Sequence, residues 1–277
     1  MLRVFVLLAV GLLLAVPVAA QDSVTSPPPP DPTRIEADAS ALRRMGRQQL
    51  ADLAAAADEV RLCLRVLDTT GDTIVHEILG PVPKVAAWEH HPPGDAFDSA
   101  SHAQFYYHCH PEAERPFPEH GHFHLFLRPL GMPPGIAPAP LADHVPPVGG
   151  NDALSHLVAI SMDHRGQAAR LFTTNRWVTG ETWYKADDVS RMLDRFAVRP
   201  LPPFPLIARW LTAMVRLFGG EIERLVRARD AVVAERAARD PTANVHEDRA
   251  LDVTSFMEID VAARTAAVDR ALAARRG

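Results

Sequence analysis

Two short stretches of alternating histidines in the middle of the chain restrict its fold more than any other feature. Residues 104–110 read QFYYHCH and residues 120–127 read HGHFHLFL. Both stretches are rich in aromatic residues and lack the spacing of a helix, which is typical of β-strands. The connection over 111–119 suits a loop between antiparallel neighbours. The sequence therefore predicts two paired strands that both carry histidines.

Strand geometry predicts that these histidines gather on one patch. Alternate residues of a strand leave the same face, so His108 and His110 share a face, and so do His120, His122 and His124. Imidazole suits zinc, iron, copper and nickel. We therefore predict a divalent transition metal, zinc or iron first, held by these five imidazoles. The alternative is a set of surface or core histidines that hydrogen-bond to their neighbours.

Acidic residues in the same region extend the prediction to chemistry. Glu112, Glu114 and Glu119 lie between the two strands and could complete a coordination shell. A bound metal would activate water for hydrolysis, with Glu119 or Glu114 as the general base. A non-enzymatic protein that binds a metal or small ligand is the other interpretation of the same residues.

The remaining pattern predicts an α+β fold with a mainly antiparallel sheet, made of two central hairpins and flanked by N-terminal and C-terminal helices. The second hairpin is expected over 154–162 and 169–174, and a last strand over 253–259. Residues 73–79 are expected as a helix end or a short strand. Helices are expected over 36–67 with a break near Gly46, over 187–196, over 205–238 with a division at Gly219 and Gly220, and over 261–275 with Asp260 as N-cap.

Two irregular segments are further candidates for function. Residues 129–151 are dominated by Pro and Gly, which is typical of a lid or binding loop or of a plain insertion. Residues 172–184 combine an arginine with tryptophans, which could hold an anionic or planar ligand. The predicted ligand-binding residues are Asn175, Arg176, Trp177 and Glu181. The structural alternative is a tight turn in which Arg176 pairs with Glu181.

The N-terminus predicts export. Residues 1–20 have one positive charge, an apolar core and small residues at the end, which is the pattern of a signal peptide cleaved after Ala20. The apolar run is short for a membrane span, although a retained anchor is the alternative, and no other segment approaches that length. Residues 21–34 are expected as a Pro-rich linker and 35–277 as a single α+β domain. The protein is therefore expected in the periplasm or secreted.

Charge and cysteine usage add two further expectations. The net charge is −5 and the chain has no basic block, so nucleic acid is not an expected partner, which leaves a small molecule or a metal. The two cysteines, Cys63 and Cys109, are expected either as one disulfide or as two unpaired buried thiols.

One local motif resembles the cupins. That family has His-x-His, then a Glu after three or four intervening residues, then a Gly after six more, and His108, His110, Glu114 and Gly121 stand at those intervals. His102 stands where a cupin has an earlier Gly. The resemblance implies metal ligands at the histidines and the glutamate.

A second motif resembles the histidine-triad nucleotide hydrolases. Residues 120–126, HGHFHLF, follow that family's His-x-His-x-His pattern with two apolar residues after it, except for Gly121. The resemblance implies that His122 attacks phosphorus in a metal-free phosphoryl or nucleotidyl hydrolase.

The widest resemblance is to an uncharacterised bacterial family, domain of unknown function 6969. It rests on the blocks WEHHPPGD, HAQFYYHCHPEAERPFPEHGHFHLFLRP, GMPPGIAPAPL, NDALSHLVAISMD and RLFTTNRWVTGETWY. The resemblance implies that these blocks belong to one domain, and it implies no substrate.

Overall fold

The computed structural model describes residues 32–38, 40–80, 86–141, 144–200 and 202–275. The predicted signal peptide and most of the predicted Pro-rich linker lie outside the described residues. Thr33 and Arg34, at the end of that linker, form the short edge strand β1.

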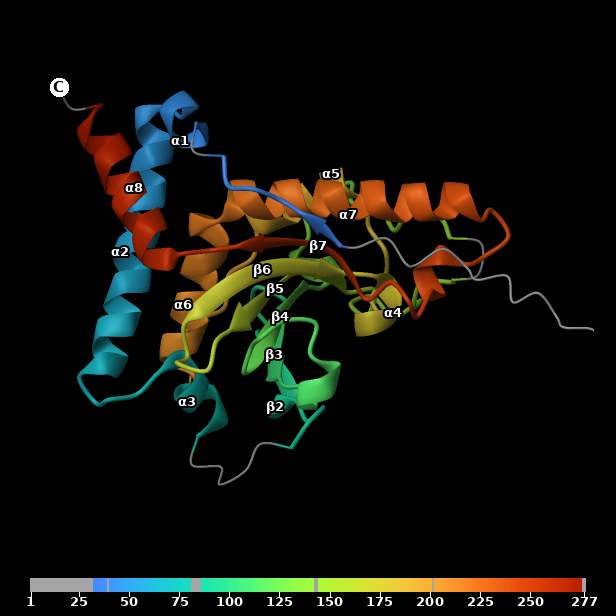
Figure 1. The fold of residues 1–277 in the computed structure, drawn as a ribbon, viewed down its shortest axis with the longest axis horizontal. Coiled ribbons are helices and arrows are strands. Elements are labelled where there is room, and N and C mark those ends of the chain that lie inside the picture. The colour runs from blue at the N-terminus through green and yellow to red at the C-terminus, as the bar shows by residue number, and fades with distance from the viewer. Residues whose placement is uncertain (1–31, 39, 81–85, 142–143, 201, 276–277) are drawn as a thin grey trace, which may run out of the picture.

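Strands and helices occur in the order that Figure 1 labels. The strands are β1 (Thr33–Arg34), β2 (His91–Phe97), β3 (Ala103–His108), β4 (Gly121–Leu127), β5 (Ser155–Met162), β6 (Ala168–Thr174) and β7 (Val253–Glu258). The α-helices are α1 (Ala41–Arg44), α2 (Arg47–Asp68), α3 (Ile74–Leu79), α4 (Arg176–Thr179), α5 (Ala186–Leu193), α6 (Pro205–Leu217), α7 (Gly219–Arg239) and α8 (Val261–Ala273). Three 3-10 turns are η1 (Glu112–Glu114), η2 (Pro129–Gly131) and η3 (Val245–Glu247).

Within the described ranges, the seven strands form one sheet in the order β1-β7-β6-β5-β4-β3-β2. Every neighbouring pair is antiparallel except β1 with β7, which is parallel. The fold is therefore α+β with a mainly antiparallel sheet. Within it β4 pairs with β5, so the strands expected as two hairpins belong to one continuous antiparallel run from β2 to β6 rather than to two separate units.

One face of the sheet is covered by helices. Phe105 and Tyr107 of β3 and Phe123 and Leu125 of β4 are buried in the main hydrophobic core, and the ring of Phe123 lies 5.9 Å from that of Trp210 in α6. Burying each such side chain contributes roughly 1.5–3 kcal/mol. Figure 1 shows α2 and α8 side by side next to α6, and α7 along the β7 end of the sheet. The histidines alternate with these core residues, so they leave the opposite face.

The expected helices form, with breaks where small or aromatic residues interrupt them. The 36–67 segment divides into α1 and α2 at Gly46, and the 205–238 segment divides into α6 and α7 at Phe218. Residues 74–79 are helix, which decides between the two structures expected there. The side chain of Asp260 accepts a hydrogen bond from the amide of Ala263 and caps α8 as expected.

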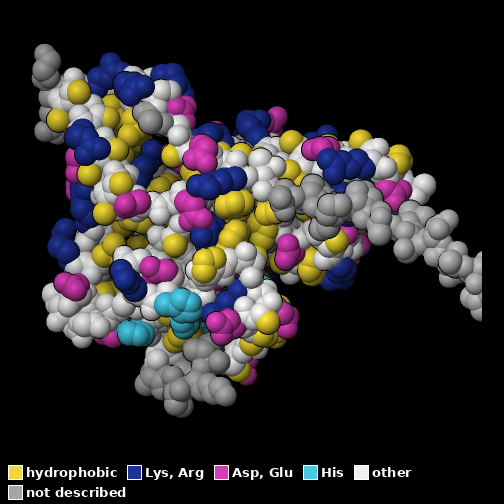
Figure 2. Space-filling view, viewed as in Figure 1, with side chains coloured by type: hydrophobic (Ala, Val, Ile, Leu, Met, Phe, Trp, Pro, Cys, Tyr) yellow, Lys and Arg dark blue, Asp and Glu magenta, His cyan; other side chains and the backbone are white. Residues whose placement is uncertain are grey.

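The Pro- and Gly-rich segment packs against the body of the protein. Met132 and Ile136 lie against the main core, and the amide of Ala139 donates to the carbonyl of Trp183 at 2.8 Å. Both cysteines are unpaired and buried, which favours the second of the two expectations for them. No helix in the described ranges has both the length and the apolar character that a membrane span needs. Figure 2 shows charges of both signs mixed across the visible face.

Candidate metal centre

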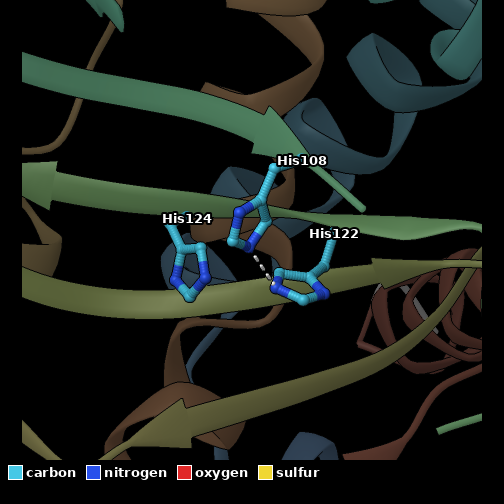
Figure 3. A group of neighbouring side chains, drawn as sticks. All are labelled: His108, His122 and His124. Carbon is cyan, nitrogen blue, oxygen red and sulfur yellow. Dashed lines mark hydrogen bonds between the residues drawn. The ribbon is translucent and has the colours of Figure 1, made fainter. Parts of the chain in front are cut away.

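Three imidazoles from two adjacent strands point into one space (Figure 3). His108 ends β3, His122 lies directly opposite it on β4, and His124 follows two residues later on the same face. One nitrogen from each ring lies within 4.8 Å of the other two, and all three side chains are buried. These three histidines, called the histidine trio below, could hold a metal ion.

His108 and His122 meet nitrogen to nitrogen. The Nε2 atoms of the two rings are 2.8 Å apart. On its other side, His122 Nδ1 lies 2.6 Å from Oε1 of Glu119, whose side chain is 1% exposed. When Nδ1 donates to this carboxylate, Nε2 of His122 presents a lone pair toward His108. A carboxylate behind a histidine is the usual outer partner in metal sites, where it fixes the tautomer and the ring direction.

His124 is held from behind by a fourth histidine. Its Nδ1 lies 3.0 Å from Nε2 of His156 on β5, and Nδ1 of His156 lies 3.4 Å from the hydroxyl of Thr174 on β6. The Nε2 of His124 is buried and has no hydrogen-bond partner among the described residues. Leaving a buried polar atom unpaired costs roughly 1–3 kcal/mol. This nitrogen is therefore free to bind a ligand.

His108 and His124 are neutral at physiological pH. Burial, followed by the charges of His122, His110 and His90, lowers the pKa of His108 from 6.5 to about 2. Burial likewise lowers the pKa of His124 well below 6.5. Only the neutral imidazole offers a lone pair to a metal, so the low pKa values leave these two rings ready to coordinate.

Burial and the contact with His122 have opposite effects on the pKa of Glu119. Burial is the largest single influence and raises the pKa of this carboxyl, but the hydrogen bond and charge of His122, together with Ser161 and His110, outweigh it and hold the pKa below the ordinary value of 4.5. The carboxylate is therefore negative and faces the ring that it orients. Its Oε2 is buried without a partner among the described residues.

The other two predicted metal ligands are placed differently. The ring of His110 lies 5.1 Å from that of His122 and against the indole of Trp88 at 4.1 Å, on the rim of the histidine trio. His120 lies away from the trio, because its Nδ1 contacts the hydroxyl of the core residue Tyr107 at 2.6 Å. His120 precedes the first residue of β4, so the alternation of that strand does not fix its direction.

Gly121 allows β3 and β4 to approach at this point. A Cβ at this position would lie 2.4 Å from the carbonyl oxygen of His108 and 2.7 Å from the hydroxyl of Tyr107. A side chain here would push the two strands apart at the point where His108 faces His122. The glycine thus positions two rings of the histidine trio.

A cavity of about 430 Å³ opens in front of the histidine trio. Its walls include Trp88, Tyr106, Phe172 and Trp177, and the exposed side chain of Glu114 lies at its edge. Glu119, the other predicted general base, is buried behind His122 instead. Glu112 is exposed on η1.

Of the four predicted ligand-binding residues in 172–184, only Trp177 lines this cavity. Asn175 is buried, caps α4 and donates to the carbonyl of Val245 at 2.7 Å. Arg176 forms an ion pair with Glu247 and reaches only the backbone oxygen of Glu181, so the expected side-chain pair with Glu181 does not form.

Glu181 belongs to the support of the site. Its Oε2 accepts a hydrogen bond from the backbone amide of His156 at 2.6 Å. Burial raises the pKa of Glu181 from 4.5 to about 8. The residue therefore helps to fix the strand that carries His156 and does not face the cavity.

Comparison with known proteins identifies the family. A family model described as Domain of unknown function (DUF6969) matches residues 54–259. The chain belongs to this family. The match includes every residue of the histidine trio, so the site lies within the DUF6969 domain. No curated protein and no solved structure matches the chain significantly.

The sequence leaves open whether His156 joins the cluster, and in the structure of this DUF6969 domain it contacts His124. His156 lies 32 residues from His124 and reaches it only because β5 pairs with β4. The sequence clue to a role for His156 is that it is a histidine within the otherwise mostly apolar strand segment 154–162. Sequence reasoning does miss the aromatic wall residues Trp88 and Phe172, because nothing in the local pattern shows what they face.

Proposed function

We propose that this protein holds one divalent transition metal ion, zinc or iron, between His108, His122 and His124. The observation that carries the proposal is the buried Nε2 of His124, which has no partner among the described residues and belongs to a group with two further imidazole nitrogens. Glu119 and His156 supply the outer contacts that metal-binding histidines usually have. Nitrogen ligands of a tetrahedral zinc lie roughly 3.3 Å apart, so small ring rotations close the trio around an ion.

We further propose that the centre is hydrolytic. Three protein ligands would leave one position open in a tetrahedral centre, and the cavity that the three histidines line would give water or a substrate access to a bound ion. A bound metal of this kind supplies a Lewis acid and lowers the pKa of water. Glu114 at the cavity edge is the residue placed to accept a proton, whereas Glu119 acts by orienting His122.

The geometry favours a metal site over a histidine nucleophile. A nucleophilic His122 would aim its Nε2 at a substrate, whereas here that nitrogen faces Nε2 of His108 at 2.8 Å, an arrangement that suits two ligands of one ion. A metal carrier without catalysis uses the same three histidines, and turnover distinguishes it from the hydrolase.

The first experiment measures metal in protein purified without a histidine tag. We expect one equivalent of metal per chain by elemental analysis and a rise in melting temperature on titration with zinc. Zinc present at 100 times its Kd should raise the free energy of unfolding by about 2.7 kcal/mol, because only the folded protein binds it. His108→Ala should abolish both effects, while His164→Ala, at an exposed position outside the trio, should retain them. No stoichiometric metal and no thermal shift in the wild type would reject the metal site.

The second experiment tests turnover. A panel of 4-nitrophenyl acetate, 4-nitrophenyl phosphate and 4-nitrophenyl glycosides is incubated with the metal-loaded protein, with and without chelator. Hydrolysis that chelator removes and zinc restores supports the hydrolase. One equivalent of metal without any chelator-sensitive hydrolysis favours the carrier. Hydrolysis of the phosphate that survives chelator, with a phosphorylated His122, would favour the histidine nucleophile.

We also propose that the protein acts outside the cytoplasm, in the periplasm or after secretion. The support is the signal-peptide pattern of residues 1–20. Cell fractionation and N-terminal sequencing test it. A chain that begins at Gln21 in the exported fraction supports export, and an uncleaved chain in the cytoplasm contradicts it.

A further inference from the structure

The cavity in front of the histidine trio is walled by aromatic side chains. Trp88, Tyr106, Phe172 and Trp177 line it, and the three histidines lie on its inner wall. Its volume of about 430 Å³ falls in the range of small-molecule sites. Aromatic walls of this kind bind flat apolar groups by stacking and by burial of apolar surface.

Trp88 is hard to explain by packing alone. Its side chain is 52% exposed, and its backbone has φ of 70°, where bulky residues are rarely found. Such a conformation costs of order 1–3 kcal/mol and tends to occur at functional sites. The amide of Trp88 donates to the carbonyl of Cys109 at 2.9 Å, which fixes the indole beside His110 at the cavity rim. An exposed indole held in this way is placed to stack on a ligand.

Trp177 is fixed from two sides. Its indole Nε1 donates to the carbonyl of Leu251 at 2.8 Å, and the guanidinium of Arg249 lies 4.5 Å from the ring centre. Arg249 itself is not among the residues that line the cavity. The ring is therefore held in place as part of the wall, with little rotamer freedom left to lose on binding.

The charges around the cavity are negative. None of the described residues that line it is Lys or Arg, whereas Glu114 and Asp252 both line it. The carboxylate of Glu119 lies directly behind His122, with its Oε1 2.6 Å from Nδ1 of that ring. The three carboxylates exceed the two positive charges of a divalent ion. A phosphate would therefore find no lysine or arginine among the described lining residues to pair with.

We infer that this cavity binds a small aromatic molecule that carries no negative charge, and that it rejects phosphorylated molecules. The inference names the substrate class of the proposed metal centre and rests on that proposal for its chemistry. Recognition of the aromatic group depends on the walls and not on the metal, so the two can be tested separately.

A matched set of naphthalene probes tests the inference. Binding of 2-naphthalenemethanol, 2-(aminomethyl)naphthalene, 2-naphthoate and 2-naphthyl phosphate is measured by calorimetry and saturation-transfer NMR on the full chain. Each probe is measured on metal-loaded protein and again after chelation. We expect the alcohol and the amine to bind at least tenfold more tightly than the phosphate and the carboxylate in both states. Tighter binding of the phosphate, or no binding of any probe, would overturn the inference.

Variants locate the binding. Trp88→Ala should weaken binding of the alcohol at least tenfold without changing the metal content. Phe97→Ala removes an aromatic ring of similar exposure that does not line the cavity, and should leave binding unchanged. Asp252→Asn with Glu114→Gln removes two negative charges from the lining, and should weaken binding of the amine relative to the alcohol and narrow the gap between the alcohol and the phosphate. Unchanged probe binding in Trp88→Ala would reject the proposal that the aromatic side chains bind the ligand. Protein that binds the probes but holds no metal would reject the metal centre and leave the aromatic binding site standing.

Discussion

Lowering the pH should destabilise the metal-free protein through its buried histidines. The pKa of His108 falls from 6.5 to about 2 and that of His156 from 6.5 to about 3, in both cases mainly because of burial. In the unfolded chain both rings regain the ordinary value and bind a proton below pH 6.5. The folded protein keeps them neutral down to about pH 3, so acid favours the unfolded state throughout this window.

The size of the effect follows from the same values. At pH 5.0 the unfolded form gains about 2 kcal/mol for each ring, because each pH unit below 6.5 contributes about 1.36 kcal/mol. His108 and His156 together remove about 4 kcal/mol, and the lowered pKa of His124 adds to this loss in the same direction. Small domains are stable by only about 5–15 kcal/mol. The loss at pH 5.0 is therefore a large fraction of the free energy of unfolding of such a domain.

Urea denaturation of metal-free protein at pH 7.5 and pH 5.0, followed by circular dichroism, measures the loss. His156→Asn should reduce the difference between the two pH values by about 2 kcal/mol. His76→Asn, at an exposed position in α3, is the matched control and should leave the difference as in the wild type. Equal free energies of unfolding at both pH values in the wild type would refute the claim that His108 and His156 are buried and neutral.

Three substitutions test the support of the site. Glu119→Gln should weaken metal affinity about 10- to 100-fold in a zinc titration with competing chelator, because it removes the outer carboxylate, whereas Glu114→Gln should leave affinity unchanged. Asn175→Ala should lower the free energy of unfolding by about 2–4 kcal/mol, since it removes a helix cap and leaves a buried carbonyl unpaired, and metal content should stay at one equivalent. Gly121→Ala should lower the free energy of unfolding by at least about 2 kcal/mol and weaken metal binding, because its Cβ would clash with a backbone carbonyl of β3. Unchanged metal affinity in Glu119→Gln, lost metal in Asn175→Ala, or wild-type stability in Gly121→Ala would each contradict the role assigned to that residue.

The histidine trio could be predicted from the sequence because it depends on strand alternation and one short loop. His108, His122 and His124 lie within regular strands, where every second residue leaves the same face. His120 lies just before β4 and is not governed by that alternation. A prediction based on spacing alone has no means of locating the first residue of the strand.

The contribution of β5 could not be predicted locally. Residues 128–154 separate β4 from β5, and no short turn fixes which strands pair. His156 therefore reaches His124 through a long-range pairing that only the fold reveals. The same reason explains why the sequence predicts two hairpins, whereas the strands form one continuous run.

The residues of the 172–184 patch show that sequence composition alone does not distinguish a ligand site from a structural network. Asn175, Arg176 and Glu181 have the composition of a ligand site, but their partners lie far away in the sequence, on η3 and β5. Buried structural networks and ligand sites use the same polar side chains. Sequence composition does not separate them, because the distinction depends on which groups face a cavity.

Anomalous X-ray diffraction from crystals grown with zinc would locate a bound metal ion and its ligands. We predict one strong peak, about 2.0–2.1 Å from a ring nitrogen of each of His108, His122 and His124, on the side of the trio that faces the cavity. No peak within bonding distance of these three rings, or zinc bound only at exposed histidines such as His76 and His164, would contradict this prediction.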